Sequence, residues 1–237
     1  MNLIDRIFSN PSKKEFKTLA LEVFRHQATE NEVYKNFLSS LRCNVMDVSS
    51  MDQIPFLPIE FFKTHQVVCG QENGNTKTFT SSGTGGIHSK HIVTKIELYE
   101  QSFLQTFELF YGSIENYAIF ALLPSYLERS DSSLIYMTET LIKKSQNPLS
   151  GFFIKDFAEL ANRIGAAERR KQKVILLGVT YALLDFAEQF PMKLKNTIVM
   201  ETGGMKGRRE EMIRSEIHQN LCNAFGVRKI HSEYGMT

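Results

Sequence analysis

Apolar residues recur at helical spacing through the first forty residues of the chain. Two such stripes are present: Phe16, Leu19, Val23 and His26, and then Val33, Phe37 and Leu41. Side chains three or four positions apart share one face of a helix, so the pattern predicts two amphipathic helices with these residues on their buried faces.

The stretch from Ile54 to Phe62 is apolar but contains Pro55 and Pro58. Proline lacks a backbone N–H and disfavours helical geometry at the residue before it. The pattern therefore indicates a stiff apolar connector packed on a core. We expect residues 1–53 to form a helical segment that packs on a main domain of residues 54–237.

Residues 76–94 follow a pattern typical of two short strands. Lys77–Thr80 and Lys90–Val93 are the expected strands, and the loop between them is rich in hydroxyl groups and glycine. The pattern predicts a β-hairpin with a flexible loop. A helix is expected next, from the spacing of Ile96, Phe103, Phe107 and Phe110, and Gly112 can end it.

The second half of the chain alternates between short apolar runs and amphipathic segments. The expected strands are 117–123, 173–178, 197–200 and 227–230, and the expected helices are 133–144, 153–164, 181–189 and 208–225. One face of the last helix is expected to carry Ile213, Ile217, Leu221 and Phe225. The alternation predicts an α/β fold with a mainly parallel sheet flanked by helices.

Ligands of such sheets bind beyond the carboxyl ends of the strands. The loops after Leu123, Gly178, Met200 and Ile230 are therefore the places where we expect chemistry.

Charge and cysteine content narrow the classes of function. Lys and Arg number 28 and Asp and Glu 26, so the net charge is +2 and gives no electrostatic reason to expect nucleic acid or a lipid surface as a partner. The cysteines, Cys43, Cys69 and Cys222, are widely spaced, which argues against a disulfide framework and a zinc site. The N-terminus lacks the apolar core of a secretory signal, and no apolar run reaches the roughly 18 residues of a membrane span. These features predict a cytoplasmic protein without a transmembrane segment.

The loop from Thr80 to Gly86 carries the strongest chemical signal. Its glycines allow positive φ angles and close approach of a ligand, and its backbone N–H groups can converge on an anion. No Gly-Lys-Ser/Thr follows, so it is not a Walker loop. Composition alone leaves two interpretations open, a phosphate-binding loop and a solvated hairpin turn.

Two further segments follow expected strands. Glu201–Gly207 reads Glu-Thr-Gly-Gly-Met-Lys-Gly and precedes the last helix, whose N-terminal end favours anions. His231–Thr237 reads His-Ser-Glu-Tyr-Gly-Met-Thr and follows the last strand. A tight turn explains the first segment equally, and a structural histidine and a core tyrosine explain the second, so each is a weak signal by itself.

The order of the three motifs resembles the adenylate-forming superfamily of acyl-CoA synthetases, luciferases and peptide-synthetase adenylation domains. The phosphate loop of that superfamily reads roughly Ser-Ser-Gly-Thr-Thr-Gly, and Ser81–Gly86 reads Ser-Ser-Gly-Thr-Gly-Gly. A later motif reads Tyr-Gly-x-Thr-Glu, and Tyr234–Thr237 matches its first four positions.

Within this superfamily, residues 55–63, 123–129, 177–181 and 201–207 resemble the LuxE-type acyl-protein synthetases, which are long-chain-fatty-acid–protein ligases. These enzymes supply activated fatty acid to an aldehyde-forming reductase. The phenylacetate-CoA ligases are the next closest resemblance. The likeness runs from about Ile54 to the end of the chain.

The resemblance implies ATP-dependent activation of a carboxylic acid, expected to be a fatty acid, to an acyl adenylate, followed by acyl transfer to a thiol. It implies that the nucleotide is bound by Ser81, Ser82, Gly83, Thr84, Gly85, Gly86, Glu201, Gly203, Gly204, Tyr234 and Gly235. It places the acid beside Gly178, Val179, Thr180, Tyr181 and Ser232. Thr237 is the implied partner of the α-phosphate, and His231 is the implied neighbour of the reacting carboxylate.

The implied cofactors are ATP and Mg²⁺, and the glutamate expected to contact the metal would follow Thr237, beyond the chain end. Gly85 departs from the motif by removing a hydroxyl donor, and the lysine that usually ends the loop is at best shifted to Lys90. We therefore expect an incomplete N-terminal domain of an adenylate-forming enzyme, without its C-terminal lid and with poor turnover alone.

Three functions remain open at this point. The first is an acid-activating ligase whose acceptor is CoA or the thiol of a partner protein or reductase; no cysteine of this chain matches the acyl-accepting one. The second is a non-catalytic nucleotide-binding module. The third is an acyltransferase that uses a pre-activated thioester without ATP.

Overall fold

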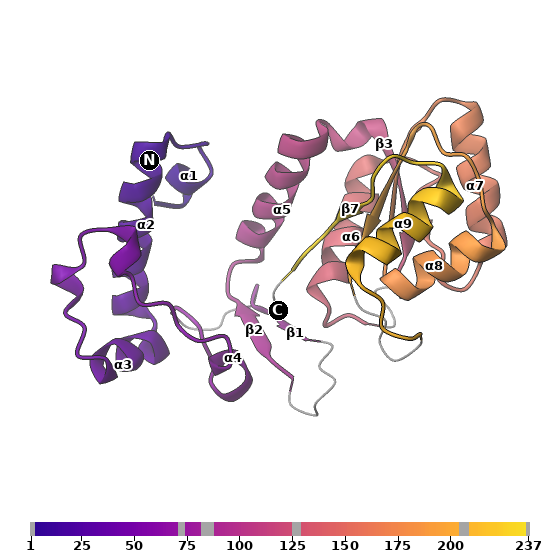
Figure 1. Cartoon of the computed structure of the whole chain (residues 1–237). Helices are drawn as coiled ribbons and strands as arrows, with labels where there is room; N and C mark the ends of the chain where they lie inside the picture. Colours follow the sequence, from indigo (N-terminus) through magenta and orange to yellow (C-terminus); the bar gives the residue numbers. More distant parts are fainter. Residues whose placement is uncertain (1–2, 71–73, 82–87, 125–128, 204–208, 236–237) are drawn as a thin grey trace. The chain divides into compact units, whose positions relative to one another are not determined.

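The computed structural model describes residues 3–70, 74–81, 88–124, 129–203 and 209–235 (Figure 1). They form two compact units. The N-terminal unit extends to Phe103 and the C-terminal unit begins at Leu104, so the division falls within helix α5, Ile96–Tyr111. The predicted boundary at residue 53 stays a prediction. Among the described residues, no helix combines the length and apolar character needed to cross a membrane.

The N-terminal unit is mostly helical. Its elements are α1 (Leu3–Ile7), α2 (Lys13–Glu30), α3 (Glu32–Ser40), two 3₁₀ turns at Val45–Asp47 and Met51–Gln53, α4 (Phe61–Thr64), β1 (Lys77–Thr80) and β2 (Lys90–Val93). The two helices predicted in the first forty residues are thus confirmed as α2 and α3. Ser12 starts α2 with a capping box to Glu15, and the Asn31 side chain caps α3 by accepting a hydrogen bond from the Tyr34 N–H at 3.1 Å.

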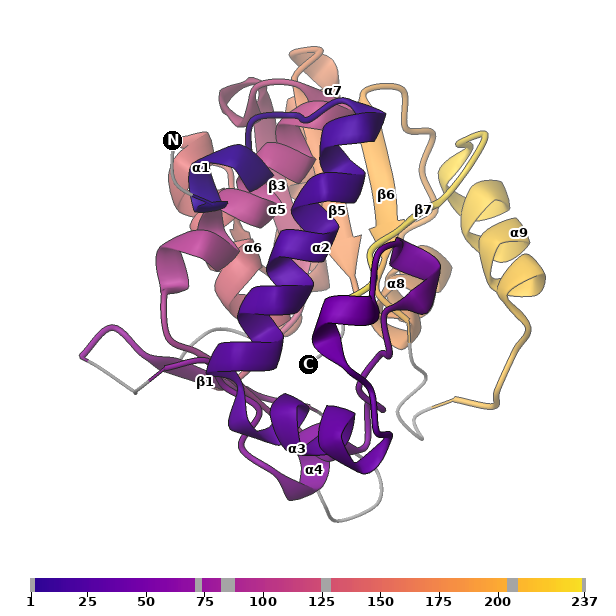
Figure 2. The ribbon, with the colours of Figure 1, turned by 90° about the vertical axis from the view of Figure 1, so that its left-hand side faces the viewer.

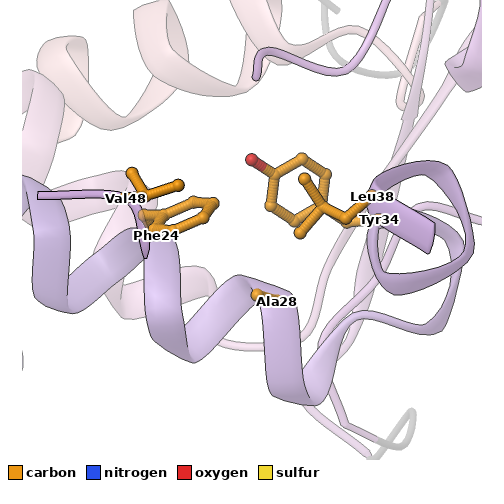
Figure 3. Packing of buried hydrophobic residues seen from close by; sticks show 5 residues of the cluster. All are labelled: Phe24, Ala28, Tyr34, Leu38 and Val48. Atoms are coloured by element: carbon orange, nitrogen blue, oxygen red, sulfur yellow. The ribbon is translucent and has the colours of Figure 1, made fainter. Parts of the chain in front are cut away.

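The buried faces of these helices differ from the predicted stripes. The core cluster of this unit consists of Phe24, Ala28, Tyr34, Leu38 and Val48 (Figure 3). Three residues of the predicted stripes are instead exposed, namely Phe16 by 52%, Leu41 by 53% and also His26, so that part of the prediction is wrong.

A tertiary hydrogen bond accounts for the difference. The Tyr34 hydroxyl donates to the carbonyl oxygen of Pro55 at 2.6 Å, and burial raises the pKa of Tyr34 to about 12. The tyrosine ring therefore faces the core with its polar atom satisfied. Leu38, four residues later, shares that face.

The proline-containing connector packs on the core only in part. Ile54 and Leu57 lie against the cluster, whereas Phe56 is 81% exposed. A chain held extended by prolines turns about once in three residues, so Ile54 and Leu57 share a side that Phe56 does not. The prediction of a fully packed connector is wrong at Phe56.

The predicted β-hairpin is confirmed. Strands β1 and β2 pair antiparallel, with Phe79 opposite His91. Phe79 is 1% exposed, and its ring lies 5.4 Å from that of Tyr99 on α5. The hairpin is therefore held by a buried aromatic contact within its own unit.

The C-terminal unit contains a parallel sheet of five strands with the order β4-β3-β5-β6-β7. Its strands are β3 (Tyr117–Leu122), β4 (Gly151–Phe152), β5 (Lys173–Gly178), β6 (Thr197–Glu201) and β7 (His231–Ser232). Figure 2 shows β3, β5, β6 and β7 in this sequence across the sheet. The predicted α/β class and the parallel sheet are confirmed.

Helices cover both faces of the sheet. They are α6 (Ser133–Ser145), α7 (Phe157–Arg169), α8 (Thr180–Gln189) and α9 (Arg214–Phe225), and a 3₁₀ turn, Ile114–Asn116, precedes β3. Helix α6 connects β3 to β4, toward one edge of the sheet. Helices α7, α8 and α9 connect the strands from β4 to β7, toward the other edge. Because parallel crossovers are right-handed, α6 lies on the opposite face from the other three (Figure 1). Every residue of β3 is buried as a result.

The predicted bounds of three elements are wrong, and the first of them, α7, also ends at Arg169 rather than 164. Helix α7 begins at Phe157 rather than 153, because Gly151 and Phe152 form the short edge strand β4 and Asp156 caps the helix at the Glu159 N–H (2.9 Å). The last strand is His231–Ser232 rather than 227–230, since β7 pairs with Met200 and Glu201 at the far end of β6.

The last helix also starts later than predicted, at Arg214 rather than Arg208. Ile213 has extended backbone angles and is 65% exposed, so it does not share the buried face of Ile217 and Leu221. The Arg209 guanidinium bonds to the carboxylates of Asp185 and Glu188 on α8. These bonds hold the segment before α9 along α8 instead of letting it coil into another helical turn.

Candidate functional site

Three of the predicted site residues lie side by side at the carboxyl end of the sheet. Gly178 ends β5, Glu201 ends β6 and Ser232 ends β7. The strand registers pair Gly178 with Glu201 and Glu201 with Ser232. Parallel strands bring their carboxyl ends to one edge, so segments far apart in the sequence converge here.

The Glu201 carboxylate is the centre of this convergence. It is 6% exposed and accepts hydrogen bonds from the Ser232 hydroxyl (2.7 Å), the Gly203 backbone N–H (2.6 Å) and the Thr180 hydroxyl (3.2 Å). One bond therefore comes from the segment after each of β5 and β6 and one from β7 itself. Such charge-assisted bonds are stronger than neutral ones.

Two cationic or titratable side chains of α9 face the same carboxylate. Arg214 Nη2 and His218 Nε2 each lie 3.6 Å from Glu201 Oε1. The His218 Nε2 atom is buried and has no hydrogen-bond partner among the described residues. Burial acts to raise the pKa of Glu201, but the bonds from Ser232, Gly203 and Thr180 and the proximity of His218 outweigh it, so the pKa is lowered and the carboxylate is ionised.

Backbone hydrogen bonds fix the loops around Glu201. The Thr202 N–H donates to the Gly178 carbonyl (3.1 Å), and the Glu233 N–H donates to the Glu201 carbonyl (2.8 Å). Gly203 has φ +75°, a left-handed conformation that glycine adopts readily, and a Cβ atom there would meet nothing within 4 Å. The sheet geometry therefore extends one residue beyond the strands before the chain turns.

A cavity of about 380 Å³ opens at this edge. It is lined by Thr180, Glu201, Thr202, Gly203, Glu211, Met212, Arg214, Ile217, Glu233 and Tyr234. Burial and the neighbouring Glu201 charge raise the pKa of Glu233. Tyr234 is 84% exposed, so its ring stands at the rim and is open to a planar group.

Of the five predicted acid-binding residues, Thr180 alone is among the residues that line the cavity. It is the first residue of α8. Val179 and Tyr181 are buried, at 2% and 8% exposure, and Gly178 packs against Leu122 and Leu183. Of the described residues of this group, Thr180 and Ser232 are the ones that bond to Glu201.

His231 lies on the opposite face of the sheet from this cavity. Its Nδ1 atom is 2.9 Å from the Tyr111 hydroxyl of α5. Successive strand residues point to opposite faces, so the His231 side chain points away from the face on which Ser232 bonds to Glu201, and neither residue lines the cavity. Burial and the nearby Lys229 charge lower the pKa of His231. Its catalytic role stays a prediction.

Much of the predicted phosphate loop lies outside the described residues, namely Ser82, Gly83, Thr84, Gly85 and Gly86, as do Gly204 and Thr237. At the start of the loop, the Ser81 N–H donates to the Ser89 carbonyl (3.1 Å), and the Ser89 N–H donates to the Ser81 hydroxyl (3.0 Å). These bonds continue the hairpin ladder beyond Thr80.

The thiols of Cys69 and Cys222 are not activated as nucleophiles. Burial raises the pKa of Cys69, whose thiol lies 3.0 Å from Gln27 Oε1, and burial raises the pKa of Cys222. A raised pKa reduces the thiolate fraction at neutral pH. Cys69 and Cys222 therefore behave as small apolar side chains rather than as reactive thiols.

Sequence reasoning missed the two α9 side chains at the site. Arg214 and His218 are four residues apart, so they share one helix face beside Ile217. The position of this helix directly after β6 was a usable signal, because its first turn has to lie near the strand ends. Motif comparison did not use it.

The fold and the site define an α/β protein with a polar cavity at the carboxyl ends of a parallel sheet. Residues 7–107 match the family described as acyl-protein synthetase, LuxE. The cavity residues, 180–234, lie outside the matched segment.

A named relative agrees with the family match. Over 74 residues the chain is 31% identical to a long-chain-fatty-acid–luciferin-component ligase of Photorhabdus luminescens. The aligned stretch is 31% of this chain and 63% of the relative, so the chain spans less than two thirds of the length of that protein.

Proposed function

We propose that the chain belongs to an ATP-dependent ligase that activates a fatty acid as an acyl adenylate and transfers the acyl group to a protein thiol. The observation that carries the proposal is the convergence of Thr180, Glu201 and Ser232 at one strand edge. By resemblance, Thr180 and Ser232 were assigned to the acid and Glu201 to the nucleotide, and in the structure the two hydroxyls bond to the Glu201 carboxylate. The family match of residues 7–107 and the name of the fatty-acid ligase relative support the same chemistry.

In the first half-reaction, an oxygen of the acid carboxylate forms a bond to the α-phosphorus of ATP, and the bond to pyrophosphate breaks. In the second, a thiolate attacks the acyl carbon, a thioester forms and AMP leaves. Both partners of the first step are anions, so positioning and charge compensation dominate its catalysis. The protein needs donors on the phosphates and a fixed acid.

The residues of this chain divide these tasks between two elements. The hairpin loop that starts at Ser81 would supply hydroxyl and backbone donors to the β- and γ-phosphates. The cavity at the strand ends would take the adenosine, with Gly203 exposing its backbone and the Tyr234 ring available for stacking. Thr180, beside Glu201, would border the acid.

Magnesium is an expected partner of ATP in this reaction. Among the described residues, no three His, Cys, Asp or Glu side chains form a group that could hold a metal ion. Mg²⁺ in nucleotide sites is mostly bound by the phosphates with one or two carboxylates, and its contribution when bound is neutralisation of phosphate charge.

Acid-dependent exchange of pyrophosphate into ATP tests the proposal. We expect a full-length version of the protein to exchange labelled pyrophosphate when ATP, Mg²⁺ and a long-chain fatty acid are present, and not when the acid is omitted. A panel of acids of different length separates a fatty-acid site from a site for short or aromatic acids. Binding of ATP without any acid-dependent exchange across the panel would contradict the ligase and favour a non-catalytic nucleotide-binding module.

The phosphate loop provides a second prediction. Gly83→Val should weaken ATP binding more than Ser82→Ala, because a β-branched side chain blocks close approach of the backbone, whereas loss of one hydroxyl bond costs about 0.5–1.5 kcal/mol. Titration calorimetry with ATP measures both. Unchanged ATP affinity in both variants would show that the loop does not contact the nucleotide.

A further inference from the structure

Glu201 joins the three segments that the proposed function divides between acid and nucleotide. Its carboxylate bonds to Thr180 at the start of α8, to Gly203 in the loop after β6, and to Ser232 on β7. It also forms part of the cavity wall. A single buried side chain therefore determines how these three segments meet.

We propose that Glu201 is a positioning residue of the nucleotide site, whose carboxylate holds the start of α8, the loop after β6 and strand β7 in the arrangement that receives the adenosine part of the nucleotide. The inference rests on the proposed function, because it presumes that a nucleotide occupies this cavity. The sequence resemblance names Glu201 among the nucleotide-binding residues; the inference assigns its carboxylate the separate role of holding the surrounding segments in place.

The backbone after β6 supports this role. The Thr202 N–H is held by the Gly178 carbonyl, and the next N–H, that of Gly203, turns back to Glu201 Oε2 at 2.6 Å. This turn gives Gly203 its positive φ of +75° and leaves the space beside its Cα open. Without the carboxylate the Gly203 N–H loses its acceptor, and the loop loses the bond that fixes its direction.

Charge supports the role as well. Among the residues that the structure describes, Arg214 and His218 of α9 and Glu233 beyond β7 are charged or titratable groups that face Glu201, and Thr180 of α8 faces it with a hydroxyl. Loss of the Glu201 charge would leave Arg214 without its carboxylate partner at the cavity wall. Gln at this position keeps the shape and one acceptor oxygen but removes the charge.

A matched control lies at the other end of the same strand. Glu168 on α7 accepts hydrogen bonds from the backbone N–H groups of Lys195 (3.1 Å) and Asn196 (3.0 Å) and from the Thr197 hydroxyl (2.8 Å). It ties the amino end of β6 much as Glu201 ties the carboxyl end. Glu168→Ala therefore removes a comparable set of bonds without touching the cavity.

The experiment measures binding of AMP, ATP and inorganic tripolyphosphate to the wild-type chain and to Glu201→Ala, Glu201→Gln and Glu168→Ala, with thermal unfolding of each. We expect Glu201→Ala to weaken AMP and ATP about ten- to a hundredfold. Glu201→Gln should weaken them less, and tripolyphosphate binding, which needs no adenosine site, should be unchanged. Glu168→Ala should lower the melting temperature and leave all three affinities unchanged.

Equal losses of AMP affinity in Glu201→Ala and Glu168→Ala would overturn the inference, because the effect would then be general destabilisation. Wild-type AMP affinity in Glu201→Ala would overturn it as well. If Glu201→Ala does not fold, Ser232→Ala and Thr180→Val each remove one of its bonds, and wild-type AMP affinity in both would overturn it. A wild-type chain that binds neither AMP nor ATP would refute the proposed function itself.

Discussion

Replacement of Phe186 by alanine should lower the free energy of unfolding of the C-terminal unit by about 3–5 kcal/mol. Phe186 is 0% exposed, and its ring lies 5.6 Å from Phe157, 5.6 Å from Phe190 and 5.9 Å from Phe225. Removal of the ring would leave a void between α7, α8 and α9 that the surrounding aromatic rings cannot all fill. Chemical denaturation followed by circular dichroism measures the change.

Phe110→Ala serves as the control for this prediction. Phe110 is on α5 and is 71% exposed, so its truncation should change stability by no more than about 0.5 kcal/mol. Similar losses in the two variants would show that the aromatic cluster of Phe157, Phe186, Phe190 and Phe225 is not the core of this unit.

Gly178→Ala should lower the free energy of unfolding by about 1–3 kcal/mol. A Cβ atom at this position would lie 2.8 Å from Leu122 Cβ and 2.9 Å from Leu183 Cγ. Leu122 is fixed in the neighbouring strand β3, so it cannot move aside without moving the sheet. Glycine is needed here for space rather than for an unusual φ angle.

Gly165→Ala in α7 is the matched control in the same unit. The added Cβ would meet only the end of the Arg169 side chain, at 3.4 Å, which can shift. Alanine in a helix interior is favoured over glycine, so we expect this variant to be more stable by up to about 1 kcal/mol. A destabilised Gly165→Ala, or a Gly178→Ala of wild-type stability, would contradict the packing described for these sites.

The sheet was largely predictable because its central strands are continuous apolar runs between turn residues. The sequence predicts both ends of β5 correctly, and it does the same for the two strands of the hairpin, β1 and β2. The buried faces of the helices in the N-terminal unit were not predictable. The Tyr34 contact with Pro55 joins residues 21 positions apart, and no local sequence pattern reports it. The two-residue strand β4 is too short to carry a period.

The strand-end residues of the candidate site were predictable from the sequence, whereas the side chains that α9 contributes were not. Parallel topology alone brings Gly178, Glu201 and Ser232 together. The separation of His231 from Ser232 follows from the period of two in a strand, but the strand had been placed at 227–230, before either residue. The contribution of His218 and Arg214 depends on where α9 begins, which Arg209 decides through its contacts with α8.

Strand β7 has only two residues and ends the sheet among the described strands. Such a short edge strand has few backbone bonds to hold it, yet its two side chains are anchored on both faces, His231 by Tyr111 and Ser232 by Glu201. One side-chain hydrogen bond at each face thus holds the outermost strand in place. Its position therefore depends on Tyr111 of α5 at one face and on Glu201 of β6 at the other.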